Sequence, residues 1–112
     1  MSEPLPLEID VRSVKALQDN HTEFLLLDVR QPEEFAAAKI EGSVLIPMGE
    51  LGERLTELGD DHDRHIVVHC HHGGRSMQVT QALRGQGYAN VQNMEGGIDQ
   101  WSEQVDPSVP RY

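Results

Sequence analysis

The sequence predicts an α/β fold in which a mostly parallel sheet of about five short strands lies between two layers of helices. Three continuous apolar runs indicate strands buried on both faces: Phe24–Leu27, Val44–Ile46 and Ile66–Val68. The segments between these runs carry apolar residues at helical spacing. Strands that alternate with helical patterns are typical of parallel sheets covered by helices, so this order predicts the fold class.

The chain is expected to begin with an irregular lead-in, residues 1–6, which contains two prolines. Leu7–Ile9 is then expected to form a short edge strand. Asp10 is the expected N-cap of a helix that reaches about Asp19, because the apolar residues that follow it then share one helical face.

The next elements centre on the first buried run. Phe24–Leu27 is expected to end as a strand at Asp28. Pro32 then opens a short helix, since proline suits the first helical turn. Glu33 and Glu34 follow it, where the helix dipole favours acidic side chains.

The middle of the chain is expected to hold a short strand and a helix. Pro47 stops the strand Val44–Ile46, because proline cannot continue a strand's hydrogen-bond ladder. A helix is then predicted from three leucines at helical spacing, Leu51, Leu55 and Leu58. Gly59 is expected to end it.

The last third of the chain repeats the same alternation. After the strand Ile66–Val68, a helix is expected to start near Ser76 and to end around Gly85 to Gly87. A last short strand is expected around Val91, and Gly96-Gly97 opens a final helix. Residues 105–112 contain two prolines and are expected to form a loose tail.

Composition limits the classes of function. The chain has 112 residues, 19 of them acidic and 9 basic, which gives a formal net charge of −10. This acidity argues against a nucleic-acid partner, since phosphate binding needs clustered Lys and Arg. No apolar run is long enough to span a membrane, and the amino terminus does not resemble a signal peptide. The single cysteine cannot form an internal disulfide, so nothing indicates an oxidising compartment and a cytoplasmic setting is expected. The length of 112 residues predicts a single domain, residues 1–112.

The loop Cys70–Ser76 concentrates the reactive residue types. It follows a buried strand and precedes a helix, which places it at the carboxyl end of the sheet. Gly73 and Gly74 allow a tight turn whose amides can form an anion-binding nest beside the helix dipole. Arg75 adds a permanent positive charge. A thiol in such surroundings loses its proton more readily than its ordinary pKa of about 8.5 implies, so Cys70 is the expected nucleophile.

Four stretches of the chain together resemble the rhodanese family of sulfurtransferases, in its single-domain form. They are Leu26–Arg30 with Pro32–Phe35, Gly42–Pro47, Cys70–Ser76, and Gly96–Ile98 with Trp101. Each stretch is a weak signal by itself, but all four occur in order and at family-like spacing. The resemblance implies a three-layer rhodanese-like fold.

The resemblance also implies an enzyme of the thiosulfate sulfurtransferase type. The Cys70 thiolate would take the outer sulfur of a donor such as thiosulfate and hold it as a persulfide, which cyanide or a thiol would accept. Arg75 would hold the anionic donor, and Asp28 would organise the loop. Ser76 would cap the helix and donate a hydrogen bond into the loop. The residues expected to bind the substrate are His71, His72, Gly73, Gly74 and Ser76. Neither a metal nor an organic cofactor is needed.

Loop length separates this chemistry from that of related phosphatases. Four residues lie between Cys70 and Arg75, as in rhodaneses, whereas the cell-cycle and tyrosine phosphatases use five. The longer ring holds a tetrahedral phosphate, and the shorter one suits a single sulfur atom. The resemblance therefore disfavours a phosphatase or an arsenate reductase. A catalytically silent binding module of this family usually lacks the cysteine. A sulfur-relay carrier, which would pass the same persulfide between proteins, stays open.

Histidines flank the cysteine on both sides. Adjacent residues rarely converge on one metal ion, and the spaced ligand pattern of a zinc site is missing, so no metal site is expected. His71 and His72 could act as general acids, bind the donor or face the solvent. Their ordinary pKa of about 6.5 permits a pH effect in any of these roles, and the three alternatives stay open.

Overall fold

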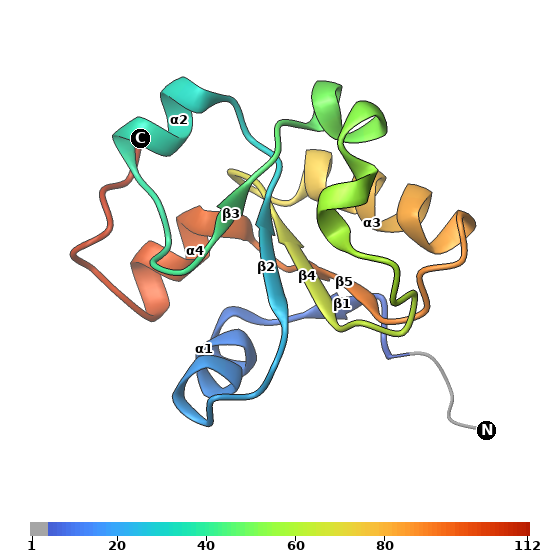
Figure 1. Ribbon diagram of the computed structural model, residues 1–112. Coiled ribbons are helices and arrows are strands. Elements are labelled where there is room, and N and C mark those ends of the chain that lie inside the picture. The colour runs from blue at the N-terminus through green and yellow to red at the C-terminus, as the bar shows by residue number, and fades with distance from the viewer. Residues whose placement is uncertain (1–4) are drawn as a thin grey trace.

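The computed structural model describes residues 5–112 and contains a five-stranded sheet with helices on both faces (Figure 1). The strand order is β1-β5-β4-β2-β3, and every neighbouring pair is parallel. The strands are β1 (Glu8–Ile9), β2 (Leu25–Asp28), β3 (Val44–Leu45), β4 (Ile66–His69) and β5 (Val91–Met94). The predicted fold class is confirmed, and the sheet is parallel throughout.

Helical segments connect the strands, and most begin where the sequence predicted. They are α1 (Val11–Asp19), α2 (Pro32–Ala37), the 3₁₀-helices η1 (Met48–Glu53) and η2 (Leu55–Leu58), α3 (Gly74–Gly85) and α4 (Gly97–Gln104). Asp10 caps α1 as expected, because its carboxylate accepts the Ser13 N–H at 2.7 Å. None of the helices in residues 5–112 combines the length and the apolar character needed to cross a membrane.

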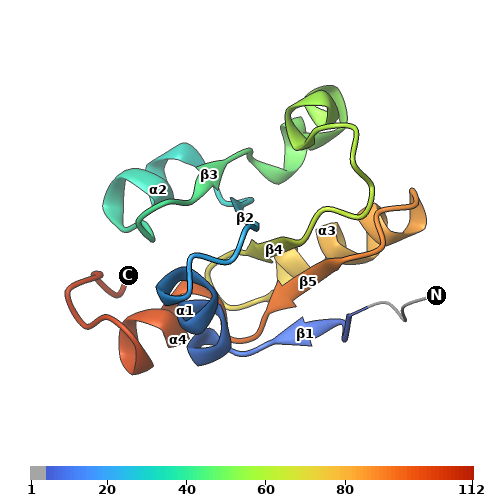
Figure 2. The same cartoon turned by 60° about the horizontal axis from the view of Figure 1, so that its bottom comes forward.

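The two faces of the sheet carry separate hydrophobic cores. Leu25 and Leu27 of β2 belong to the core beneath α3, η1 and η2. Leu26 points the other way, into the core formed with α1 and α4. Figure 2 shows α1 and α4 together on one side of the sheet and α3 on the opposite side. Because both faces of β2 and β4 are covered, these two strands read as apolar runs. The prediction that Val44–Ile46 is buried on both faces is wrong for Val44, which lies on the edge strand β3 and is 41% exposed.

The predicted helix over the three leucines is wrong. Two 3₁₀-helices replace it, separated at Arg54, whose φ of −116° and ψ of 18° lie outside helical values. Gly49 and Gly52 lie within η1, and glycine weakens a continuous α-helix. Leu51 and Leu58 are nevertheless buried in the core. The leucine spacing therefore predicted which residues are buried, but it did not distinguish an α-helix from a 3₁₀-helix.

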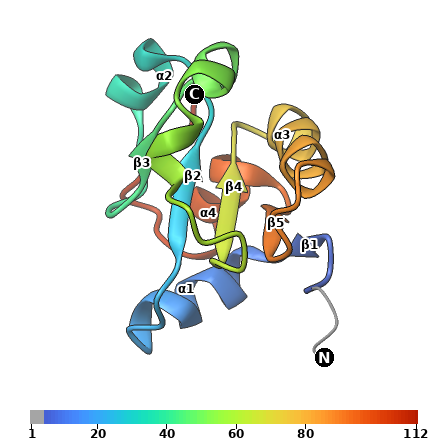
Figure 3. The same ribbon diagram turned by 45° about the vertical axis from the view of Figure 1, so that its right-hand side comes forward.

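The carboxyl ends of β2 and β4 lie side by side. Asp28 at the end of β2 is in register with His69 at the end of β4. Figure 3 shows both strands pointing toward the same edge of the sheet, with the connection from β4 to α3 beyond the tip of β4. This edge therefore receives Cys70 and the turn after Asp28.

The tail packs against the domain, so the prediction of a loose segment over residues 105–112 is wrong. Val109 is buried with an exposed fraction of 7%, and its carbonyl accepts a hydrogen bond from the Ser102 hydroxyl. In Figure 1 the chain ends beside α2. At the other end of the chain, residues 1–4 of the predicted lead-in lie outside the described residues. Leu5 and Pro6 have no helix or strand, and their carbonyls accept bonds from Arg84.

Candidate active site

Cys70 lies directly after β4 with an exposed fraction of 1%. Three groups donate hydrogen bonds to its sulfur: the Gly73 N–H at 3.1 Å, the Ser76 N–H at 3.4 Å and the Ser76 hydroxyl at 3.3 Å. The sulfur therefore occupies the centre of the turn formed by residues 70–76. Such donors stabilise the thiolate more than the thiol, because their partial positive charges face it.

The pKa of the Cys70 thiol reflects two opposing effects. Burial raises this pKa, since the charged thiolate loses its hydration. Hydrogen bonds from the Ser76 side chain and from the backbone N–H groups of Ser76, Gly73 and Arg75 lower it. The hydrogen bonds prevail, and the pKa lies below its ordinary value. A lowered pKa is typical of cysteines that act as nucleophiles, which makes Cys70 the candidate for that role.

Gly73 allows the turn to close. Its φ of 119° lies in the region that favours glycine, and it forms the N-cap of α3, which begins at Gly74. Ser76 lies within the first turn of α3, so its predicted role as the helix cap is wrong. Its predicted hydrogen bond into the loop is present, because its hydroxyl contacts both the Cys70 sulfur and the Gly73 carbonyl.

The amino-terminal turn of α4 holds the other side of the loop. The Ile98 N–H donates to the Cys70 carbonyl at 2.9 Å, and the Asp99 N–H donates to the His71 carbonyl at 3.1 Å. A Cβ atom on Gly97 would lie only 2.4 Å from the His71 carbonyl oxygen. Gly97 is therefore required for this close approach, since any larger residue there would displace the loop.

Asn93 of β5 fixes the surroundings of Ser76. Its buried amide nitrogen donates to a carboxylate oxygen of Glu8 at 3.3 Å. This orientation turns the amide oxygen toward the Ser76 hydroxyl, which donates to it. Because a hydroxyl has one proton, Asn93 and the Cys70 sulfur compete for the same donor.

Arg75 pairs with Glu34 of α2 through two parallel hydrogen bonds of 2.7 and 2.9 Å. The Tyr112 hydroxyl donates to the same carboxylate at 2.6 Å. Arg75 holds the pKa of Glu34 well below its ordinary value, and the pKa of Arg75 is raised in return. The backbone of Arg75 supports the thiolate, while its side chain joins the loop to α2.

Asp28 contacts the site indirectly. Its carboxylate binds the buried Arg30 guanidinium, with the shortest contact at 2.7 Å, and accepts no hydrogen bond from the loop. Arg30 in turn donates to the Tyr112 hydroxyl at 2.9 Å. His69 lies 3.8 Å from Asp28, and burial lowers its pKa to about 4, so its ring is neutral at pH 7.

His71 and His72 form one stack of rings with Tyr112. The His71 ring lies 4.0 Å from the Tyr112 ring, with the two planes 10° apart. The His72 ring lies 4.0 Å from His71 on a 29° tilt. Burial lowers the pKa of His71, which favours its uncharged form. The three rings form an aromatic wall on the loop.

Of the predicted site residues, the structure thus places Gly73 and Ser76 against the Cys70 sulfur. Three further residues that the sequence reasoning missed also contact the site. Glu34 was assigned only to a helix start, although it lies in one of the four rhodanese-like stretches. Asn93 carries no signal beyond its strand, and Tyr112 lies in the segment predicted to be loose. Each of these three contacts the site from a distant part of the chain.

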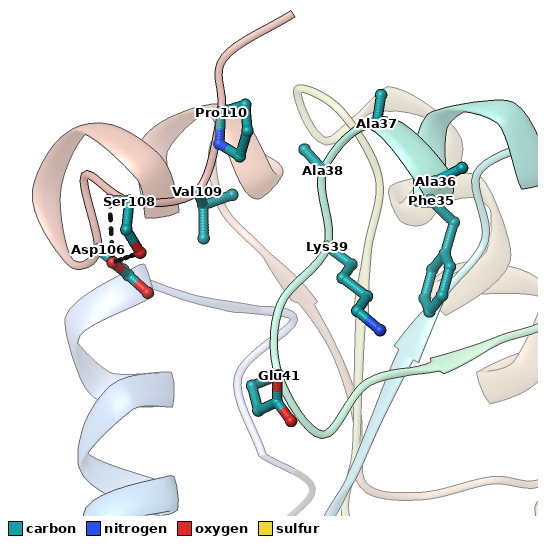
Figure 4. A pocket seen from close by; sticks show the side chains of 10 residues that line it. All are labelled: Phe35, Ala36, Ala37, Ala38, Lys39, Glu41, Asp106, Ser108, Val109 and Pro110. Atoms are coloured by element: carbon teal, nitrogen blue, oxygen red, sulfur yellow. Dashed lines mark hydrogen bonds between the residues drawn. The ribbon is translucent and has the colours of Figure 1, made fainter.

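A separate surface hollow of about 460 Å³ lies between the tail and the segment that follows α2 (Figure 4). Its lining residues are Phe35, Ala36, Ala37, Ala38, Lys39, Glu41, Asp106, Ser108, Val109 and Pro110. None of them belongs to the Cys70 loop. The hydrogen bonds to the Cys70 sulfur, rather than this hollow, therefore define the candidate active site.

Comparison with known proteins agrees with this geometry. A sulfurtransferase of Allochromatium vinosum is 35% identical over 102 residues, which cover 91% of this chain and 94% of that protein. The rhodanese-like/PpiC domain-containing protein 12 of Arabidopsis thaliana is 38% identical over 91 residues, or 78% of this chain. The chain spans only 30% of the length of that plant relative.

Solved structures give the same result. The human single-domain sulfurtransferase TSTD1 superposes with a TM-score of 0.80 at 27% sequence identity. The match covers 89% of this chain and 98% of the human chain. The family model of the rhodanese-like domain matches residues 10–104, which include α1, the Cys70 loop and α4. The chain belongs to the rhodanese-like domain family.

Proposed function

We propose that this protein is a sulfurtransferase that carries sulfur as a persulfide on Cys70. The observation that supports the proposal best is the cluster of donors around one buried sulfur, from Gly73 and Ser76. These donors stabilise a negative charge on the thiolate and, after sulfur transfer, on a persulfide. The family and its sulfurtransferase relatives support sulfur transfer as the general chemistry.

The first half-reaction forms the persulfide. The Cys70 thiolate attacks the outer sulfur of the donor, and a new S–S bond forms as the old bond to that sulfur breaks. The electron pair of the broken bond leaves with the donor remnant, which is sulfite when the donor is thiosulfate. No net oxidation occurs, because the sulfane sulfur only changes its partner.

The second half-reaction returns the thiolate. A nucleophilic acceptor attacks the outer sulfur of the persulfide, and the electron pair of the Cys70 S–S bond returns to the Cys70 sulfur. Cyanide would leave as thiocyanate, and a thiol would leave as a new persulfide. The loop donors face the Cys70 sulfur in the resting protein, so they are already oriented when the thiolate reforms.

The short loop supports sulfur transfer over phosphate ester hydrolysis. Four residues separate Cys70 from Arg75, and the N–H groups of Gly73 and Ser76 already point at the Cys70 sulfur. The Arg75 guanidinium is bound to Glu34. A phosphatase needs a wide ring of donors and a free cation around a tetrahedral phosphate, which this arrangement does not offer.

Intact-protein mass spectrometry tests the proposal. Incubation with thiosulfate or with cysteine persulfide is expected to add one sulfur atom to the wild-type protein, and cyanide is expected to remove it as thiocyanate. Cys70→Ser is expected to abolish the adduct, because the chain has no other cysteine. Failure of the wild-type protein to gain sulfur from either donor or from polysulfide would contradict the proposal.

The same experiment distinguishes an enzyme from a relay carrier. Slow reaction with all small donors, together with rapid uptake from a persulfidated protein, would assign the protein to sulfur relay. Fast reaction with small donors would assign it to small-molecule sulfur transfer. Cys70→Ser is the control in both cases, since a persulfide cannot form on a hydroxyl.

A further inference from the structure

On the basis of the proposed sulfur transfer, we propose that Glu34 determines the donor class. By neutralising Arg75, Glu34 makes Cys70 take sulfur from persulfides of small organic thiols in preference to the thiosulfate dianion. The sequence alone assigned Arg75 to holding an anionic donor. The pairing of its side chain with Glu34 indicates that Arg75 does not favour an anionic donor.

Arg75 is the one Lys or Arg in the loop from Cys70 to Ser76. Its guanidinium makes two parallel contacts with the two oxygens of Glu34, at 2.7 and 2.9 Å. Such bidentate pairs are among the stronger ion pairs of proteins. The Tyr112 hydroxyl donates to Glu34 at 2.6 Å and accepts from Arg30, which holds the carboxylate in place. The charge of Arg75 is therefore already compensated before any donor arrives.

The other guanidinium groups beside the loop are also compensated. Arg30 is paired with Asp28 at 2.7 Å, and Arg111 is paired with Asp99 at 2.9 Å. The ring of His72 lies 3.9 Å from the same Asp99. Among the described residues around the loop, each arginine thus has a carboxylate partner, and no excess of positive charge faces the Cys70 thiolate.

This charge balance weighs against a dianionic donor. The thiolate repels an approaching thiosulfate, and the net charge of −10 opposes its approach at longer range. A neutral or singly charged persulfide is repelled less strongly, because the Coulomb energy scales with the charge of the donor. Screening at physiological salt weakens the long-range contribution, so the local balance around Arg75 decides the preference.

The stacked rings favour an organic donor as well. His72, His71 and Tyr112 form a continuous stack with successive ring centroids 4.0 Å apart. Tyr112 keeps 43% of its surface exposed, which makes it one of the large apolar side chains most accessible to solvent. An organic group can pack against the faces of these rings, whereas the faces offer sulfite oxygens no hydrogen-bond donor.

The reaction with such a donor balances without any co-reactant. The thiolate of Cys70 attacks the outer sulfur of R–S–SH, the bond between the two donor sulfurs breaks, and its electron pair leaves with R–S⁻. The proton stays on the transferred sulfur, so Cys70 becomes Cys70–S–SH. The leaving thiolate carries one negative charge, while sulfite would carry two.

Glu34→Gln tests the inference, with Glu33→Gln as the matched control. Both variants remove one negative charge from α2, but Glu33 is exposed and is not the residue that binds Arg75. Rate constants for sulfur uptake by Cys70 are measured with thiosulfate and with cysteine persulfide. The wild-type protein is expected to react faster with the persulfide. Glu34→Gln is expected to raise the thiosulfate rate constant roughly tenfold, less at high salt, and to leave the persulfide rate constant within roughly threefold.

Alkylation of Cys70 measures the same charge balance without sulfur chemistry. The ratio of the rates with iodoacetate and with neutral iodoacetamide cancels changes in the pKa of the thiol. Glu34→Gln is expected to raise this ratio roughly threefold, because iodoacetate carries half the charge of thiosulfate. Glu33→Gln is expected to leave it nearly unchanged.

The outcomes separate this inference from the proposed function. If the wild-type protein prefers thiosulfate, or if Glu33→Gln and Glu34→Gln raise the thiosulfate rate constant equally, the role of Glu34 is wrong while sulfur transfer stands. If no donor transfers sulfur, the proposed function is wrong. The alkylation ratio then still decides whether Glu34 neutralises Arg75.

Discussion

The pKa of the Cys70 thiol depends in part on one hydroxyl proton, that of Ser76. Ser76 can donate it to the Cys70 sulfur, to the Gly73 carbonyl or to the Asn93 amide oxygen. Burial of Cys70 raises its pKa, and the hydrogen bonds to its sulfur, that of the Ser76 side chain foremost, lower it. When the thiolate forms, its full charge makes it the best of the three acceptors. The Ser76 side chain is therefore the largest of the contributions that offset the effect of burial on the pKa of Cys70.

Ser76→Ala is expected to raise the pKa of Cys70. The side-chain hydrogen bond from Ser76 is the largest of the contributions that lower this pKa, so its loss leaves burial less opposed. The midpoint of the pH profile for alkylation by iodoacetamide should move to higher pH, and the rate at pH 7 should fall by roughly three- to tenfold. Ser76→Thr keeps the hydroxyl and is the control. An unchanged midpoint in Ser76→Ala would mean that the backbone N–H groups alone stabilise the thiolate.

At this scale, sequence reasoning found the residues that are neighbours in the chain. Cys70, Gly73 and Ser76 lie within seven positions of one another, so their spacing reported their contact. Glu34 and Tyr112 reach Arg75 and His71 from 41 positions away in each case. Their side chains meet the loop only after the sheet and the tail have folded. Nothing in the local sequence around Tyr112 indicates this contact.

At the scale of the elements, a fully buried ion pair lies at the end of β2 and in the turn after it. The side chains of Asp28 and Arg30 are both 0% exposed and lie 2.7 Å apart. Arg30 also donates to the Ala38 carbonyl at 2.6 Å and to the Glu34 carbonyl at 3.3 Å. One guanidinium thus joins the end of β2 to both ends of α2. A buried pair of this kind adds little net stability, but losing one partner leaves an uncompensated charge in the core.

Asp28→Asn is expected to lower the free energy of unfolding by about 3–5 kcal/mol, because Arg30 would stay buried without its counter-charge. Urea denaturation at pH 7 measures this change. Asp19→Asn is the matched control, since the same substitution breaks the exposed Lys15–Asp19 pair on α1. That pair is expected to contribute no more than about 0.5 kcal/mol. Similar losses of unfolding free energy in the two variants would show that Arg30 does not depend on Asp28 to compensate its buried charge.

Most elements were predictable because the local sequence shows which residues are buried and which residue caps a helix. Continuous apolar runs identified β2 and β4, and the Asp10 cap marked the start of α1. The segment from Met48 to Leu58 was not predictable in type, because leucine spacing reports a buried face and not the hydrogen-bond pattern behind it. The sequence predicts Ser76 as the cap because serine favours that position, but Gly73 occupies it by adopting a positive φ.

For the whole molecule, the carboxyl-terminal segment completes the edge of the sheet at which Cys70 lies. Val109 contributes to the same core as Ile98 and Trp101 of α4. From there the chain continues to Arg111, which pairs with Asp99 at the start of α4, and to Tyr112 on His71. The tail therefore links the core beneath the sheet to the Cys70 loop. Its two prolines suggest a loose segment, but Val109 between them and Arg111 and Tyr112 after them make the contacts that hold it.

Val109→Ala tests whether the tail is part of the folded core. Val109 is 7% exposed, so removing two methyl groups is expected to lower the free energy of unfolding by about 1–2 kcal/mol. Val44→Ala is the matched control, because Val44 is 41% exposed and the same truncation there should cost no more than about 0.5 kcal/mol. Both values come from urea denaturation monitored by circular dichroism.

Because the tail also carries Tyr112, Val109→Ala should in addition speed alkylation of Cys70 by iodoacetate relative to iodoacetamide, as Glu34 loses its second partner. A loss of stability no larger than that of Val44→Ala would mean that the tail is not anchored in solution.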